Sequence, residues 1–188
     1  MTNYVLNVMS DDHPGIISSV AAAIESLNGN ILSCSQTVLG GYFTLIMIVT
    51  LPETMKPEEL QAYVLNYTAG SCKIDVSVRV ANGNAPKKDT PERYVVSVFG
   101  TDQVGVVRRF TEYMADHEIN IVDMYGGIRK NTNGEDEFFL TGQIEIPTKW
   151  NFPMLQCDLE ALGKELGFTV RLQHENIFVA TNRIRFRH

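Results

Sequence analysis

The pentapeptide Asp11-Asp12-His13-Pro14-Gly15 separates a short apolar segment from an amphipathic one, and the arrangement recurs ninety residues later at Thr101-Asp102-Gln103-Val104-Gly105. Residues 3–38 align with residues 93–128 without a gap. For a window of this length, roughly two identities are expected by chance. The identical pairs are Tyr4/Tyr94, Val5/Val95, Val8/Val98, Asp12/Asp102, Gly15/Gly105, Asn30/Asn120 and Ile31/Ile121. The sequence therefore predicts a duplicated supersecondary unit organised around this turn.

The first unit shows the element order β-α-β-β-α-β. Residues 3–9, 30–38 and 42–50 are rich in β-formers, and Gly40-Gly41 joins the last two as a hairpin. Pro57 opens a second helix, and residues 73–80 alternate as a strand does. In the first helix, Pro14 is expected in the first turn, and the expected apolar stripe is Ile17, Val20, Ala21, Ile24 and Leu27. This order predicts an α+β, ferredoxin-like fold with two helices on one face of an antiparallel sheet.

The second unit repeats this order with a longer hairpin. Phe138-Phe139 is matched to Tyr42-Phe43, which predicts an insertion of six residues with Asn133-Gly134 in the turn. We expect two ferredoxin-like domains, residues 1–80 and 93–176, joined by a linker over residues 81–92. Residues 177–188 form a basic tail that adds an edge strand, docks on an acidic partner or frays.

Charge and composition exclude several classes of protein. Residues 1–80 hold 3 basic and 7 acidic side chains and residues 93–174 hold 8 and 12, so neither unit shows the basic face of a nucleic-acid binder. No apolar run approaches the length of a membrane span, and the first residues lack a basic signal region, so a cytoplasmic protein is expected. Cys34, Cys72 and Cys157 are expected to be reduced and mostly buried.

The sequence shows no pattern typical of an enzyme. It contains no zinc, redox, nucleophile-elbow or phosphate-loop motif, so we expect no catalytic residue, metal or cofactor. His13 is interpreted as a solvated turn residue, because its counterpart Gln103 cannot transfer protons. The acidic cluster Glu135-Asp136-Glu137 is expected to be a solvated hairpin tip, with a divalent cation as the alternative.

The repeated turn is the predicted ligand site. A helix N-terminus offers free backbone N–H groups and a mildly positive end, which suit a carboxylate, and glycine lets a ligand approach the backbone. A small amino acid is therefore a chemically suitable ligand. The alternative, which the sequence leaves open, is that the aspartates cap helices and the glycines and asparagines only shape the turns. The predicted ligand-binding residues are Asp12, His13, Gly15, Ile16, Asn30, Ile31, Asp102, Gly105, Val106, Asn120 and Ile121.

These motifs carry a family resemblance. The pattern Asp-x-Pro-Gly at residues 12–15, followed by Asn30-Ile31, resembles tandem ACT-domain proteins and, among them, the glycine cleavage system transcriptional repressor-like family. The segments Ile31-Leu32-Ser33-Cys34-Ser35-Gln36-Thr37-Val38, Phe43-Thr44-Leu45-Ile46-Met47, Leu162-Gly163-Lys164-Glu165-Leu166-Gly167 and Val170-Arg171-Leu172-Gln173-His174-Glu175-Asn176-Ile177-Phe178 resemble small single-ACT proteins. The resemblance implies an effector site near Gly15 and Asn30 and a copy of it in the second unit, often at an interface between ACT units. Val104 departs from the pattern in the second copy, so the first copy is preferred.

From these observations we expect a non-enzymatic regulatory protein that binds a small amino acid or related metabolite and signals to a protein partner. The resemblance implies glycine or serine as ligand, and transcriptional control of amino-acid metabolism as the setting. Two alternatives remain: an interaction module that needs no ligand, and a regulatory subunit of a biosynthetic enzyme. A homodimer is expected because domains this small commonly pack on one another or on a second copy.

Overall fold

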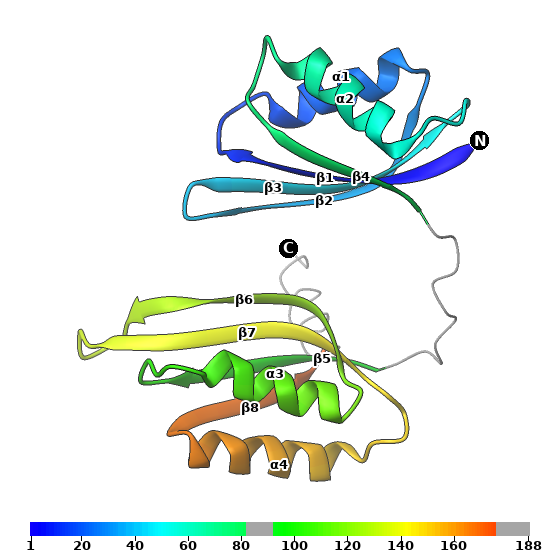
Figure 1. The fold of residues 1–188 in the computed structure, drawn as a ribbon. Coiled ribbons are helices and arrows are strands. Elements are labelled where there is room, and N and C mark those ends of the chain that lie inside the picture. The colour runs from blue at the N-terminus through cyan, green and yellow to red at the C-terminus, as the bar shows by residue number, and fades with distance from the viewer. Residues whose placement is uncertain (82–91, 176–188) are drawn as a thin grey trace, which may run out of the picture. The chain divides into compact units, whose positions relative to one another are not determined.

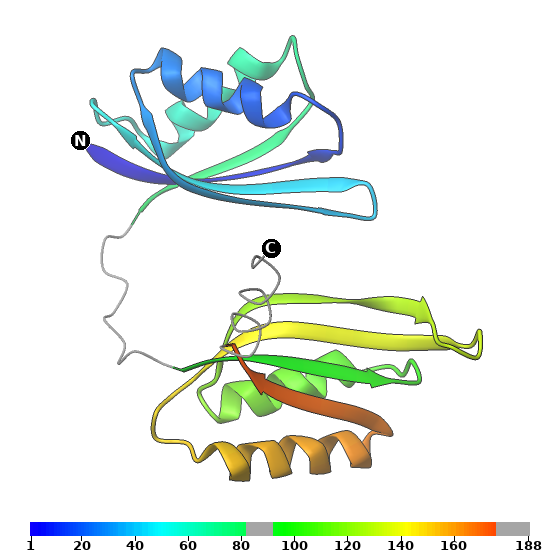
Figure 2. The same ribbon diagram turned by 180° about the vertical axis from the view of Figure 1, so that it is seen from behind.

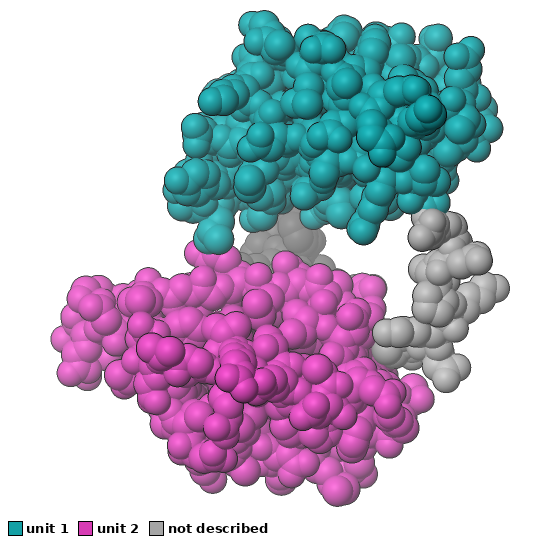
Figure 3. All heavy atoms as spheres, in the orientation of Figure 1, with its two compact units in different colours: residues 1–86 teal, residues 87–188 magenta. Residues whose placement is uncertain are grey.

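The computed structural model describes residues 1–81 and 92–175, and the chain divides into two compact units, Met1–Pro86 and Lys87–His188 (Figure 3). The predicted linker over residues 81–92 and the predicted tail over residues 177–188 fall almost entirely on positions outside the described residues. The predicted domain boundaries therefore stay predictions, and each unit is described by itself.

The first unit is a sheet of four antiparallel strands with two helices on one face (Figures 1 and 2). Its elements are β1 (Thr2–Asp11), α1 (Ile16–Ser26), β2 (Asn30–Leu39), β3 (Tyr42–Leu51), α2 (Pro57–Thr68) and β4 (Asp75–Val80). The strand order is β2-β3-β1-β4, so β1 and β3 are central and β2 and β4 form the edges. This is the predicted ferredoxin-like arrangement, which is confirmed.

The second unit has the same architecture. Its elements are β5 (Glu92–Gly100), α3 (Val106–Asp116), β6 (Asn120–Lys130), β7 (Asp136–Ile146), α4 (Phe152–Glu165) and β8 (Phe168–His174). The strand order β6-β7-β5-β8 repeats that of the first sheet, and both helices again lie on one face (Figure 1). Among the described residues, no helix is both long and apolar enough to cross a membrane.

Each unit buries its own core between the sheet and the two helices. Side chains alternate along a strand, so Tyr4, Leu6 and Val8 of β1 point toward the helices and are fully buried. The intervening Val5 and Asn7 belong to the opposite face, which neither α1 nor α2 covers. We call this second face the outer face of the unit. In β5, the buried residues Tyr94, Val96 and Val98 repeat the pattern of β1.

The first helix of each unit begins at a different residue from the one that periodicity predicted. Ile16 and Val106 are buried, whereas Ile17 and Val107 are 43% and 39% exposed. The predicted stripe is therefore wrong at Ile17, while its members Val20 and Ile24 are buried and Leu27 packs against the core. Gly15 is the N-cap residue, and Pro14 therefore precedes the helix and is not part of its first turn. Two consecutive isoleucines made the stripe ambiguous, and packing of Ile16 into the core decided between them.

Strand pairing also corrects the length of the second hairpin. Ser10 lies opposite Phe43 in the first sheet, and its equivalent Gly100 lies opposite Phe138 in the second. Phe138 therefore corresponds to Phe43, and the hairpin of the second unit is longer by five residues and not by six. The predicted turn around Asn133-Gly134 is observed between β6 and β7.

The cysteines differ partly from the prediction. All three are free, but only Cys72 is buried, whereas Cys34 and Cys157 are exposed. Cys34 lies on the edge strand β2, where nine of the ten residues are exposed because the helices do not cover it. The prediction that the thiols are mostly buried is therefore wrong.

The packing of α4 on β8 gives a test of the second core. A Cβ atom added at Gly163 would lie 2.5 Å from Val170 Cγ2 and 2.8 Å from the backbone oxygen of Phe168. We expect Gly163→Ala to lower the free energy of unfolding by about 1 to 3 kcal/mol, because the helix must move off the sheet. Chemical denaturation followed by the fluorescence of Trp150, the single tryptophan, reports on this unit. Gly127→Ala of the same unit is the control, because its added Cβ would meet only Phe139 side-chain atoms, at 3.6 and 3.8 Å; equal effects of the two variants would contradict the packing.

Tyr94 gives a second test, through pH. Burial, together with the Glu92 carboxylate that accepts the hydrogen bond of the phenol, raises the pKa of Tyr94 to about 12. A tyrosine in the unfolded chain has a pKa of about 10. The raised pKa therefore adds stability that is fully present below pH 10 and is lost as the pH rises to 12. We expect the unfolding free energy of the second unit to fall across this window, and less so in Tyr94→Phe. Tyr125→Phe, at an exposed tyrosine of the same unit, is the control, and an unchanged slope in Tyr94→Phe would refute this assignment.

Candidate functional site

The turn between β1 and α1 leaves a helix N-terminus open. Gly15 caps α1 with φ of 103°, a left-handed conformation that glycine adopts at little cost, and its carbonyl accepts the Ser19 N–H at 3.0 Å. The first N–H groups of an α-helix have no partner within the helix. No described side chain caps them, and no acidic residue lies in the first turn. The interpretation of Asp12 as a helix cap is therefore wrong, and these donors are free to bind an anion.

A depression of about 600 Å³ lies over this helix N-terminus. Its lining combines the turn with two strands, β2 and β3, and consists of Asp12, His13, Pro14, Gly15, Ile16, Ile17, Ser18, Gln36, Val38 and Phe43. Six of these residues are not among the predicted ligand-binding residues. Pro14, Ile17 and Ser18 belong to the predicted turn and the helix that follows it, whereas Gln36, Val38 and Phe43 come from the hairpin. The hairpin contained the signal: pairing Leu39 with Tyr42 across Gly40-Gly41 also places Val38 opposite Phe43, on the helix face of the sheet.

The depression has one polar wall and one apolar wall. Gln36 lies opposite the buried Leu45, so it belongs to the helix face and offers an amide that both donates and accepts hydrogen bonds. Val38, Phe43 and Ile17 supply apolar surface. The ring of His13 contacts the carbonyl oxygen of Pro14 through Nδ1 at 3.0 Å. Ile16 is almost fully buried, so only its backbone is available to a ligand.

The predicted residues do not all meet in one place. Asn30 lies opposite Thr50, near the start of β1, whereas the turn follows the other end of β1, where Asp11 lies opposite Tyr42. The helix between them, α1, is about 16 Å long. Within one unit, Asn30 and the half-buried Ile31 are therefore separated from Asp12, His13, Gly15 and Ile16. A single unit does not bring Gly15 and Asn30 together, because α1 runs back along the sheet before β2 begins.

The second turn has the same backbone with different surroundings. Gly105 caps α3 with φ of 90°, Val106 is buried, and Asp102 forms no described cap. The Gln103 amide donates to the carbonyl oxygen of Leu166 at 3.0 Å, which ties the turn to the C-terminal end of α4. Arg109 pairs with Glu165 at 2.7 Å in the same region. This turn is therefore engaged in holding the unit together.

Two further differences leave the second copy of the turn with fewer polar side chains available to a ligand. The residue equivalent to Gln36 is Gly126, and a Cβ atom there would lie 2.9 Å from Leu140 Cδ1, so this position offers no side chain. The Asn120 amide donates to Glu145 Oε2 at 3.0 Å, and Ile121 is half-buried beside it. In the first unit, by contrast, the Asn30 side chain forms no hydrogen bond with any described residue. The first copy is therefore the one with unused polar groups.

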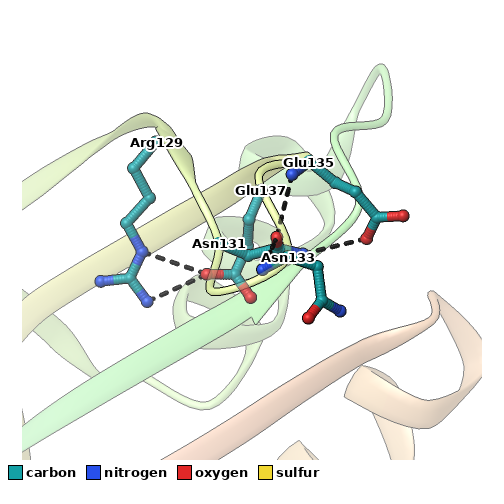
Figure 4. A network of polar contacts seen from close by, with 5 residues as sticks. All are labelled: Arg129, Asn131, Asn133, Glu135 and Glu137. Carbon is teal, nitrogen blue, oxygen red and sulfur yellow. Dashed lines mark hydrogen bonds and ion pairs between the residues drawn. The ribbon is translucent and has the colours of Figure 1, made fainter.

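Each acidic side chain of the hairpin tip contacts a neighbouring residue, and Figure 4 shows the contacts of Glu135 and Glu137. Glu137 accepts from Arg129 at 3.0 Å, Asp136 pairs with Lys130 at 2.8 Å, and Glu135 accepts from the Asn131 amide at 3.1 Å. The Asn131 carbonyl oxygen also accepts the backbone N–H groups of Asn133 and Glu135. Over residues 1–81 and 92–175, no group of three His, Cys, Asp or Glu side chains is placed to hold a metal ion. These contacts form a network of ion pairs and hydrogen bonds at the hairpin tip.

Comparison with known proteins agrees with this architecture. A UPF0237 protein of Methanosarcina acetivorans is 37% identical over 97 residues, a match that spans 50% of this chain and 99% of the relative. A UPF0237 protein of Methanocaldococcus jannaschii is 37% identical over 93 residues, spanning 49% of this chain and 98% of the relative. Each relative thus corresponds to about half of this chain.

Two solved structures share the fold over nearly the whole chain. A protein of unknown function from Galdieria sulphuraria has a TM-score of 0.74 at 23% identity and covers 92% of this chain and 98% of its own. A candidate glycine cleavage system transcriptional repressor has a TM-score of 0.66 at 16% identity and covers 93% and 98%. The model of the ACT domain matches residues 3–78 and again residues 92–173. The chain therefore belongs to the ACT domain family and carries two ACT domains in tandem.

Proposed function

We propose that this is a cytoplasmic, non-enzymatic regulatory protein that binds a small amino acid or related metabolite at the α1 turn of the first unit. The open N-terminus of α1 beneath the depression is the observation that carries the proposal. Membership of the ACT family supports a regulatory role. In this proposal the ligand changes how the chain engages a protein partner, such as a transcription factor or an enzyme.

The chemistry of the depression favours a small zwitterion. The N–H groups at Ile16, Ile17 and Ser18 suit a carboxylate, because the helix dipole adds to their hydrogen bonds. The Gln36 carbonyl oxygen suits an ammonium group or a hydroxyl. Val38 and Phe43 offer apolar surface beside these polar groups. Glycine and serine carry the carboxylate and ammonium groups that this chemistry requires, and the name of the repressor-like structure suggests glycine cleavage as the controlled process.

The separation of Asn30 from Gly15 adds a geometric condition. A single small ligand cannot contact both residues of one unit across a helix about 16 Å long. If Asn30 binds the same ligand, it must come from a different ACT unit. Such a site would join two units, and a ligand bound there would favour one arrangement of units over another, which is the requirement for allosteric signalling.

A second function is favoured by a separate observation. The edge strand β2, from Asn30 to Leu39, contains no charged side chain and no proline. Natural sheets usually protect their edges with such residues, so an unprotected edge is suited to pairing with another strand. A ligand-independent interaction module, or a regulatory subunit that docks on a biosynthetic enzyme, would use this edge.

Thermal unfolding against each common amino acid distinguishes these functions. A ligand at one hundred times its dissociation constant adds about 2.7 kcal/mol of stability, which corresponds to several degrees in domains of this size. We expect such a shift for one or two small amino acids. Gln36→Ala is expected to reduce it, because this variant removes an exposed amide and leaves the core intact.

Matched glycine variants locate the ligand. Gly15 and Gly105 both have positive φ and nothing within 4 Å of an added Cβ, so Gly15→Val and Gly105→Val impose similar backbone strain. We expect only Gly15→Val to abolish the shift. Loss of the shift in Asn30→Ala would show that the site joins two units. The absence of a shift with every amino acid would refute ligand binding and favour the interaction module.

A further inference from the structure

The outer face of the first unit is apolar at its centre. Val5 and Met9 of β1 and Ile46 and Ile48 of β3 belong to this face, and Met9 and Ile46 are 49% and 46% exposed. Neither helix of the first unit covers it, since α1 and α2 both lie on the opposite face (Figures 1 and 2). Aliphatic side chains gathered on one exposed face are typical of an interaction surface.

The face is also hollowed. A depression of about 410 Å³ is lined by Val5, Asn7, Ile46, Ser77, Val78 and Arg79. Asn7 lies opposite Ile46 on one side and opposite Ser77 on the other, so these three residues form a row across β3, β1 and β4. The hollow is centred on this row, and its lining is mostly uncharged.

Two charges of opposite sign flank that row along β4. Arg79 lies opposite Val5, and Asp75 lies opposite Met9. Both side chains are exposed, and neither forms an ion pair with another described residue. They are four residues apart on one strand, which separates them by about 13 Å, too far to neutralise each other. The face thus has a cation at one end and an anion at the other.

We propose that this outer face packs against the same face of a second copy of the chain, with the two-fold axis lying across the strands at the Asn7 row. Rotation about such an axis makes the strands of the two copies run in opposite directions. It also places β4 of one copy against β4 of the other. Arg79 of each copy then faces Asp75 of the other, and the row of Val5 and Ile48 faces the row of Met9. The interface is self-complementary, as a two-fold interface must be.

The size of the face fits a modest dimer. Four strands spaced about 4.8 Å apart, with about eight residues each, present roughly 500 Å² per copy and so bury about 1,000 Å² in total. This value is at the lower limit for a specific interface. The angle between the packed sheets is expected to be about 30°, as in other aligned sheet packings. Because the interface is small, we expect the two reciprocal ion pairs to contribute much of the dimerisation affinity and to fix how the two sheets are aligned.

The second unit lacks these features. The positions equivalent to Asp75 and Arg79 are Thr169 and Gln173, so its β8 carries neither charge. Ile46 and Ile48 are replaced by Thr141 and Gln143, and the Gln143 amide donates to Glu175 at 3.0 Å. The same packing in the second unit would keep apolar side chains at Val95 and Phe99, the positions of Val5 and Met9, but would lose the contacts of Ile46 and Ile48 and both ion pairs, so the interface is assigned to the first unit.

Charge reversal tests the proposal on the full chain. Sedimentation equilibrium over a range of concentrations is expected to show a monomer–dimer equilibrium for the wild type. Arg79→Asp and Asp75→Arg each place like charges opposite one another at both symmetric contacts, so each is expected to weaken dimerisation at least about tenfold. The double variant Arg79→Asp/Asp75→Arg exchanges the charges and is expected to restore it. Gln173→Asp, at the equivalent position of the second unit, is the matched control and should have no effect.

Three outcomes would overturn the proposal. A wild type that stays monomeric at all concentrations would show that no second copy packs on the outer face. In that case, a loss of stability in Arg79→Asp would show that another part of the same chain covers this face. Dimerisation that is unchanged in both single variants would place the interface elsewhere, for example at the β2 edge. A double variant as weak as the single variants would show that the charges do not face one another. Thermal unfolding of each variant without ligand shows that the first unit remains folded.

Discussion

The pairing of β1 with β3 is the interaction on which the rest of the first unit depends. It sets Thr2 opposite Leu51 at one end and Asp11 opposite Tyr42 at the other. This register places the hairpin around Gly40-Gly41 beside the turn that leads into α1, and the Asp12 N–H donates to the Gly41 carbonyl at 2.8 Å. It thereby brings β2 side chains to the helix N-terminus. The same register carries the start of β2 to the far end of the sheet, away from the turn.

Duplication preserved this framework and changed how each copy is stabilised. All six ion pairs found among the described residues lie in the second unit. Gln103 links its turn to α4. Within its long hairpin, Arg129 bonds Glu137 and Asn131 bonds the backbone of Glu135. Exposed ion pairs contribute little individually, so their main consequence is that these polar groups are already occupied. In the first unit, the side chains of Asn30 and Gln36 form no hydrogen bond with any described residue, which is why ligand binding is assigned to it.

The fold was predictable because its signals are local and repeated. Alternation in the strands, glycines at the turns and a duplicated motif all favour one arrangement. The site was predictable only in part. The motif placed Gly15 correctly, but the proximity of Gln36 depends on pairing across a hairpin, and the distance of Asn30 depends on the direction in which α1 runs. The error at Ile16 and Ile17 arose because two adjacent apolar residues give the same periodicity, and only core packing separates them.

The two proposed surfaces lie on opposite faces of the same strands. Phe43 points toward the helices and lines the ligand depression, while its neighbour Thr44 belongs to the outer face, opposite Met9. A ligand and a second copy of the chain therefore do not compete for space. Any coupling between them must pass through the β1–β3 pair, whose backbone hydrogen bonds resist sliding because a shift of one residue would exchange the two faces. A coupling between the two faces would therefore have to act through small changes in sheet twist and not through a change of register.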